Sequence, residues 1–76
     1  MVIGVTMVSV VPGKERNFYI ESKNKKYIRE VYHVFGEFDF VVIIDAPTLS
    51  ELNKTVDELR AIEGVYKTHT VVGAEI

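Results

Sequence analysis

The chain has 76 residues, of which 47% are hydrophobic and 26% charged, and its formal net charge is −2. This balance predicts one soluble globular domain over residues 1–76 and excludes a disordered chain, while the acidic net charge excludes a general electrostatic attraction to nucleic acid. The sequence has no Cys and only two isolated His residues, which excludes disulfides and thiolate metal sites and argues against a zinc site.

The chain begins with a predicted strand and a predicted helix. Residues 2–11 are rich in Val and Ile, which favours a strand, and Pro12 with the following Gly ends it. Residues 14–25 predict a helix. Its apolar side is thin, with Phe18 and one of the next two residues as its buried members.

Two further strands follow, over residues 27–35 and 38–45, and both are rich in β-branched and aromatic residues. Gly36 and Glu37 lie between them. This pair suits a tight hairpin turn, because Gly adopts positive φ at little cost.

A second helix is the clearest element of the sequence. Its apolar residues recur at helical spacing, and they are Leu49, Leu52, Val56, Leu59 and Ile62. Thr48 and Glu51 match a capping box at its start, and Gly64 suits the C′ position after its end. Residues 65–74 then predict a fourth strand.

The predicted order β-α-β-β-α-β is that of the ferredoxin-like α+β fold. Right-handed crossovers place both helices on one face of a four-stranded antiparallel sheet. The other face is then bare, although strands 2–11 and 38–45 are apolar on both sides. We therefore expect sheet-to-sheet dimers of the dimeric α+β barrel type, which also support a domain that buries only about 60% of its unfolded surface.

Three stretches of the sequence match motifs of one known module. Residues 11–15 read VPGKE, residues 31–40 read VYHVFGEFDF, and residues 59–70 read LRAIEGVYKTHT. In this order and spacing they resemble the effector-binding RAM domain of the Lrp/AsnC family, the feast/famine transcription regulators. The resemblance covers essentially the whole chain.

The resemblance implies a non-enzymatic module, without catalytic residues or cofactor, that binds an amino acid or a related small molecule. It also implies homo-oligomers, in which dimers assemble into octamer-like rings, and co-assembly with full-length Lrp/AsnC regulators. Those regulators carry an N-terminal helix-turn-helix domain, for which residues 1–76 leave no room. We therefore expect a stand-alone member of the family or an excised domain, with Met1 favouring the former, and in either case no direct contact to nucleic acid. With no signal peptide and no membrane-length apolar run, we expect it in the cytoplasm.

The residues expected to bind the ligand are Gly36, Glu37, Phe38, Asp39, Thr68 and Thr70. The ammonium group of an amino acid needs an acceptor, such as the Asp39 carboxylate, and its carboxylate needs N–H donors or hydroxyls. The backbone at Gly36 and Glu37 is expected to supply the donors, and the two threonines share one strand face from which their hydroxyls can add to them. In the family these motif positions line or adjoin the effector pocket.

Each of these residues also has a purely structural interpretation. Gly36 is equally a plain turn glycine, and Asp39 a turn residue that bonds the nearby backbone. Phe38 suits a core or an interface, and the threonines suit any half-exposed strand. Glu37 and Asp45 are expected in solvent.

Two alternative functions stay open at this point. A purely structural assembly domain would share the fold and bind nothing. A small dimeric α+β barrel enzyme is the other alternative, since fold alone does not decide function. Its only conceivable general-base pair is His33 with Asp39, while His33 and His69 are otherwise surface or interface residues.

Overall fold

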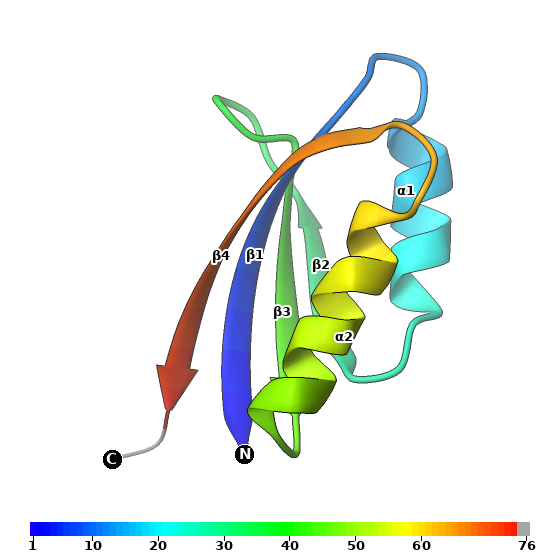
Figure 1. The fold of residues 1–76 in the computed structure, drawn as a ribbon. Coiled ribbons are helices and arrows are strands. Elements are labelled where there is room, and N and C mark those ends of the chain that lie inside the picture. Colours follow the sequence, from blue (N-terminus) through cyan, green and yellow to red (C-terminus); the bar gives the residue numbers. More distant parts are fainter. Residues whose placement is uncertain (75–76) are drawn as a thin grey trace.

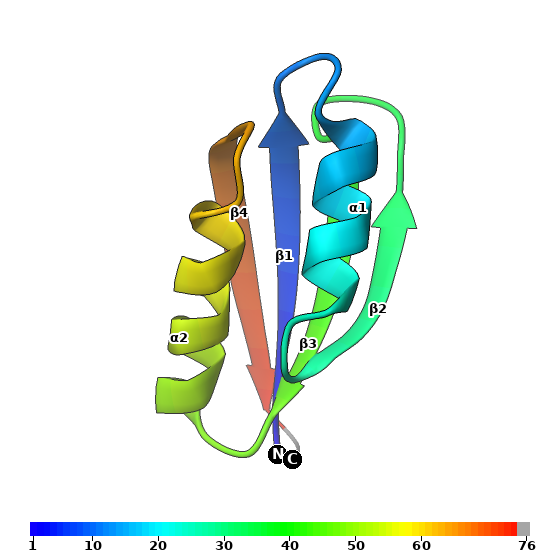
Figure 2. The same ribbon diagram turned by 90° about the vertical axis from the view of Figure 1, so that its right-hand side faces the viewer.

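The computed structural model describes residues 1–74. Its elements are β1 (Val2–Val10), α1 (Glu15–Lys23), β2 (Ile28–His33), β3 (Phe40–Ala46), α2 (Leu49–Arg60) and β4 (Val65–Ala74). This order, β-α-β-β-α-β, is the one expected from the sequence. The strands form one antiparallel sheet in the order β2-β3-β1-β4, and Figure 1 and Figure 2 show both helices on the same face of it. The predicted ferredoxin-like α+β fold is confirmed.

The core lies between the sheet and the two helices. Its buried hydrophobic residues are Val8, Val10, Phe18, Phe40, Val42, Ile44, Ala46, Leu52, Leu59 and Ile62. Residues of β3 alternate between buried and half-buried from Phe40 to Ala46, which is the pattern of a strand with one face in the core. The face that carries Val8, Phe40 and their neighbours therefore packs against the helices.

Each helix turns a narrow stripe toward this core. In α1 the buried residues are Phe18 and Ser22, four positions apart, so the expectation that Tyr19 or Ile20 would join Phe18 is wrong. In α2 most of the predicted stripe is buried, but Leu49, the first helical residue, is 52% exposed. The stripe therefore begins one turn later than the sequence indicates.

The ends of α2 show one capping prediction confirmed in part and one wrong. The Glu51 N–H donates to Thr48 Oγ1 at 3.1 Å, which is one of the two bonds of a capping box, but no bond from the Thr48 N–H to the Glu51 carboxylate is present among residues 1–74. Gly64, however, is not at C′, because the helix ends at Arg60 with Ala61 as its C-cap. It lies in the turn that follows, where the Val65 N–H bonds the Ile62 carbonyl and Gly64 has a φ of +97°.

Gly64→Ala is expected to lower the free energy of unfolding by about 2–4 kcal/mol, because it combines left-handed backbone strain with a steric clash. A Cβ at this position would lie 2.6 Å from Lys14 Cβ, an atom that cannot rotate away. Gly13 is the matched control, since its φ is +96° but an added Cβ would meet nothing within 4 Å. Gly13→Ala should cost only about 1–2 kcal/mol. Urea unfolding of both variants measures the difference, and equal losses would contradict the clash.

The connection between β2 and β3 is longer than the predicted two-residue turn. Strand pairing ends at His33 opposite Phe40, so the connection spans residues 34–39 instead of 36–37. The Val34 N–H donates to the Asp39 carbonyl at 2.8 Å and closes this loop, and Gly36 inside it has a φ of +133°. Gly36 thus has the turn role that the sequence predicts, in a wider loop.

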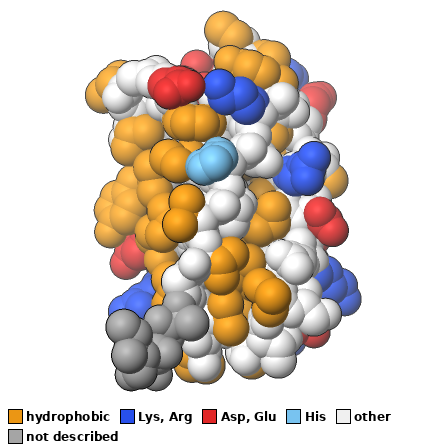
Figure 3. All heavy atoms as spheres, turned by 60° about the vertical axis from the view of Figure 1, so that its left-hand side comes forward, with side chains coloured by type: hydrophobic (Ala, Val, Ile, Leu, Met, Phe, Trp, Pro, Cys, Tyr) orange, Lys and Arg blue, Asp and Glu red, His pale blue; other side chains and the backbone are white. Residues whose placement is uncertain are grey.

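The sheet face opposite the helices is open and largely apolar, as expected. Its half-buried hydrophobic residues on the two central strands are Ile3, Val5, Met7, Val41 and Ile43. Tyr32 and Val71 extend the patch onto the edge strands and are 51% and 53% exposed. Figure 3 shows hydrophobic side chains over much of this face, with charged ones mostly toward its rim. We call this surface the open face.

Asp45 is a charged residue on the open face. It pairs with Ile3 at one end of β3 and is half-buried, so the expectation that it lies in solvent is wrong. Arg29 Nη1 lies 3.8 Å from its Oδ2, and Oδ1 is buried without a hydrogen-bond partner among residues 1–74. Asp45 is thus partly buried among apolar neighbours of the sheet, although an aspartate is ordinarily expected at the surface.

Candidate functional site

Asp39 is positioned by the end of β1. Its backbone N–H donates to the Val8 carbonyl at 2.9 Å, and the Val10 N–H donates to its Oδ2 at 2.8 Å. The carboxylate is therefore half-buried and held in one orientation. Among residues 1–74 no hydrogen bond reaches its other oxygen, Oδ1, which leaves an acceptor for a donor from outside the chain.

The rest of the hairpin lies over the rim of the open face and is tied to β4 by Lys67. The Lys67 ammonium group is 3.6 Å from Glu37 Oε1 and 4.9 Å from the centre of the Phe38 ring. Ser9 donates to the Glu37 carbonyl at 3.4 Å, which explains how Ser9 is buried on this face. Figure 1 shows the loop leaning to the side opposite the helices. The sequence does not single out Lys67, because thirty positions separate it from the hairpin that it holds.

Thr68 and Thr70 share one face of β4, as predicted, but it is the face that the helices cover. They pair with Val8 and Thr6, whose side chains are buried on the helix side. Thr70 Oγ1 is 2.9 Å from Thr6 Oγ1, so its hydroxyl satisfies a buried neighbour. Thr68 lines a hollow of about 410 Å³ beside Arg60 and Tyr66.

The predicted site residues thus fall into two groups within one chain. Gly36, Glu37, Phe38 and Asp39 lie on the loop 34–39, where Glu37 and Phe38 contact Lys67 and Asp39 accepts the Val10 N–H. Thr68 and Thr70 point to the other side of the sheet. A ligand that met both groups would have to lie between two copies of the chain, each contributing one group.

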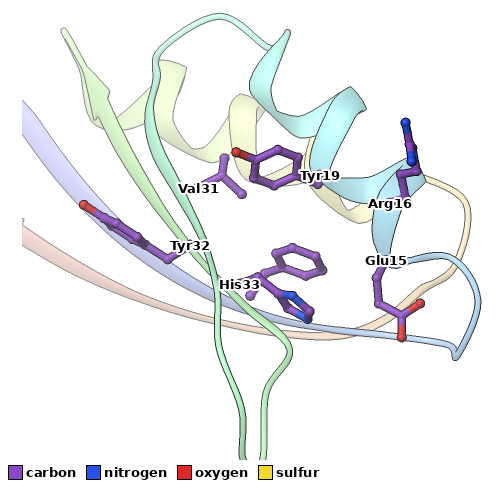
Figure 4. Close-up of a pocket in the computed structure, with 7 residues that line it drawn as sticks. Glu15, Arg16, Tyr19, Val31, Tyr32 and His33 are labelled. Carbon is purple, nitrogen blue, oxygen red and sulfur yellow. The ribbon is translucent and has the colours of Figure 1, made fainter.

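A separate concave surface of about 610 Å³ lies between α1 and β2 (Figure 4). Its lining residues are Glu15, Arg16, Tyr19, Val31, Tyr32, His33 and Phe40. Figure 4 shows Tyr19 of the helix facing Val31 of the strand across this space. We call it the α1–β2 groove. Sequence patterns do not reveal it, since it depends on how a helix and an edge strand lie side by side.

His33 belongs to this groove and does not form the general-base pair considered above. Its ring stacks on Phe40, with centroids 4.8 Å apart, and no hydrogen bond joins it to Asp39 in the described part of the chain. Residues 1–74 contain no group of three or more His, Asp or Glu side chains placed to hold a metal ion. Neither helix in that range has the length and hydrophobicity that crossing a bilayer requires.

Comparison with known proteins identifies relatives in sequence and in fold. The HTH-type transcriptional regulator FL11 of Pyrococcus furiosus is 37% identical over 73 residues, which are 93% of this chain and 47% of the regulator. The crystal structure of hypothetical protein PHS023 from Pyrococcus horikoshii is 26% identical with a TM-score of 0.91, and the match covers 100% of this chain and 93% of that one. Regulator NMB0573 of Neisseria meningitidis, solved as an L-Met complex, has the same fold, with a TM-score of 0.81 at 16% identity over 97% of this chain and 50% of its own.

The chain spans half or less of the length of the curated regulators that it matches. The shared part is one defined domain, because the family model described as Lrp/AsnC ligand binding domain matches residues 3–74. That family is one of ligand-binding regulatory modules. With this match over nearly the whole chain, and with the sheet, helices and hairpin that the family resemblance predicts, the chain belongs to the Lrp/AsnC ligand-binding domain family.

Proposed function

We propose that this chain binds a free amino acid and thereby changes its assembly with itself or with full-length Lrp/AsnC regulators, as a non-enzymatic module of residues 1–76. The observation that carries the proposal is the Asp39 carboxylate, which one hydrogen bond from Val10 fixes while its second oxygen stays open. A fixed carboxylate suits an ammonium group, because charge-assisted hydrogen bonds are stronger than neutral ones. The regulator solved as an L-Met complex, similar in fold, supports an amino acid as the ligand class.

The remaining contacts of the ligand follow from the two groups of residues. The backbone at Gly36 and Glu37 lies in an exposed loop beside Asp39 and offers N–H groups to the ligand carboxylate. Thr68 and Thr70 are on the opposite side of the sheet, so a second copy must bring their hydroxyls, and Phe38 adds an apolar wall. The site we propose is therefore completed between copies.

Self-association is the second part of the proposal. The open face exposes apolar side chains of all four strands, and packing two such faces together removes them from water. These dimers then assemble further, into ring-like oligomers. Ligand binding between copies shifts assembly only if the ligand binds one assembly more tightly than the other.

Asp39→Asn tests the ligand site without removing its structural bond, because an Asn side-chain oxygen still accepts the Val10 N–H. A ligand present at about 100 times its dissociation constant should stabilise the protein by about 2.7 kcal/mol per site. We expect a thermal-shift screen of the twenty amino acids to find such a ligand with the native chain. Asp39→Asn should abolish the shift and keep the melting temperature of the unliganded protein close to native.

Asp39→Ala is the companion variant. It loses the carboxylate and the bond to Val10, so both the ligand-dependent shift and the stability of the free protein should fall, the latter by about 1–3 kcal/mol. An unchanged ligand-dependent shift in Asp39→Asn would show that the site lies elsewhere. No response of the native chain to any amino acid would favour a purely structural assembly domain.

A further inference from the structure

Phe35 is the most exposed large hydrophobic side chain in residues 1–74, with 94% of its surface in water. It lies in the loop 34–39 beside Gly36, away from the Lys67 contacts that hold the later part of that loop. Among residues 1–74 its one aromatic neighbour is His33, with ring centroids 5.5 Å apart. A Phe exposed to this extent contributes nothing to the core of its own chain, and its burial requires a surface from outside.

The α1–β2 groove has the chemistry to receive such a ring. Its walls are largely apolar or aromatic, with Tyr19 and Val31 facing each other across it (Figure 4). The His33 ring stacks on the buried Phe40. Aromatic rings prefer offset or edge-to-face contact with other rings, which the exposed rings of Tyr19 and His33 offer. Glu15 and Arg16, the first two residues of α1, place their charged groups at one end of the groove, so the ring would not displace them.

We propose that Phe35 of one chain inserts into the α1–β2 groove of a second copy. Phe35 follows His33 by two positions, so the ring and the groove lie at the same edge of the molecule, at the end of β2. A two-fold axis near this edge makes the contact reciprocal, with each chain supplying one ring and one groove. A reciprocal contact of this kind gives a closed dimer and not an open filament.

This contact differs from the packing of open faces, because the groove lies on the side of β2 that α1 covers. A chain with both contacts joins sheet-face dimers into larger closed assemblies. The formation of larger assemblies therefore rests on the sheet-face dimer of the proposed function. The insertion of Phe35 itself does not depend on ligand binding.

The test compares Phe35→Ser and Tyr19→Glu by analytical ultracentrifugation across micromolar concentrations. The first variant removes the ring, and the second places a charge in the groove at a half-exposed helix position. Because two insertions are lost at once, each variant should raise the dissociation constant of this contact by at least about 100-fold. Tyr66→Ser and Ile20→Glu are the matched controls, since these exposed residues do not line the groove and should leave assembly unchanged.

Mixing the two variants gives the decisive result. Phe35→Ser retains an intact groove and Tyr19→Glu retains an intact ring, so a mixed pair regains one of the two insertions. The mixture should associate about tenfold more tightly than either variant alone. Native-like sedimentation of Phe35→Ser, or a mixture no tighter than its components, overturns the inference. Either result would leave the proposals of an open-face dimer and of amino-acid binding standing, because other variants test them.

Discussion

Phe18→Ala is expected to lower the free energy of unfolding by about 3–5 kcal/mol, the range for removing a large aromatic side chain from a core. Phe18 is fully buried and is the main residue by which α1 contacts the sheet. Its ring lies 4.8 Å from that of Phe40, so its removal leaves a cavity beside a second aromatic ring. A chain of this size has a total stability of only about 5–15 kcal/mol, so the variant should be close to unfolding.

Phe35→Ala is the matched control, because it removes the same side chain from a position that is 94% exposed. Its free energy of unfolding should stay within about 0.5 kcal/mol of native. Urea unfolding at low protein concentration, where assembly does not contribute, measures both variants. If Phe18→Ala cost no more than Phe35→Ala, α1 would not be anchored to the sheet as the structure shows.

The sequence predicts the architecture well because the hydrophobic period differs sharply between elements. The stripe of α2 recurs at helical spacing and its Thr48 cap marks the start, so the beginning of the helix is found to the residue, although its end is not. The two central strands are apolar on both faces, which indicates coverage on both sides. The open apolar face follows from the element order and these strands together.

The predictions that fail depend on tertiary contacts that no local pattern records. The loop between β2 and β3 is wider than predicted because Asp39 bonds Val8 and Val10 of a strand some thirty positions earlier, which delays the start of β3. Gly64 is required by the approach of Lys14 and not by the end of α2. The sequence points to Asp39 and Gly64 as residues with a structural or functional role, but it does not identify Val10 and Lys14 as their partners.

In the candidate site, too, local sequence patterns predict some features, while others depend on tertiary contacts. The hairpin motif singles out the Asp39 carboxylate as a candidate, whereas the contacts of Lys67 and the α1–β2 groove depend on the tertiary structure. The alternation of β4 predicts that Thr68 and Thr70 lie together, but it does not say on which side of the sheet. Their pairing with Val8 and Thr6 decides this, and it separates them from Asp39.

Val5→Asp is expected to abolish dimerisation through the open face. Val5 is at the centre of that face, on β1 between Ile43 and Val71, and two-fold symmetry would bury two such carboxylates in one interface. An unpaired buried charge costs several kcal/mol, so the dissociation constant should rise by at least about a thousandfold. The change is best made in the Phe35→Ser background, where the open face is the remaining contact of the two proposed.

Leu49→Asp in the same background is the control for this change. It introduces the same charge at an exposed apolar residue on the helix side, where the first turn of α2 favours a carboxylate. Sedimentation equilibrium should show Phe35→Ser and its Leu49→Asp derivative as dimers, and the Val5→Asp derivative as a monomer with native circular dichroism. A folded Val5→Asp derivative that still dimerised at the parent concentration would exclude the open face as the interface. The apolar side chains of β1 and β3 that lie outside the core would then need another explanation.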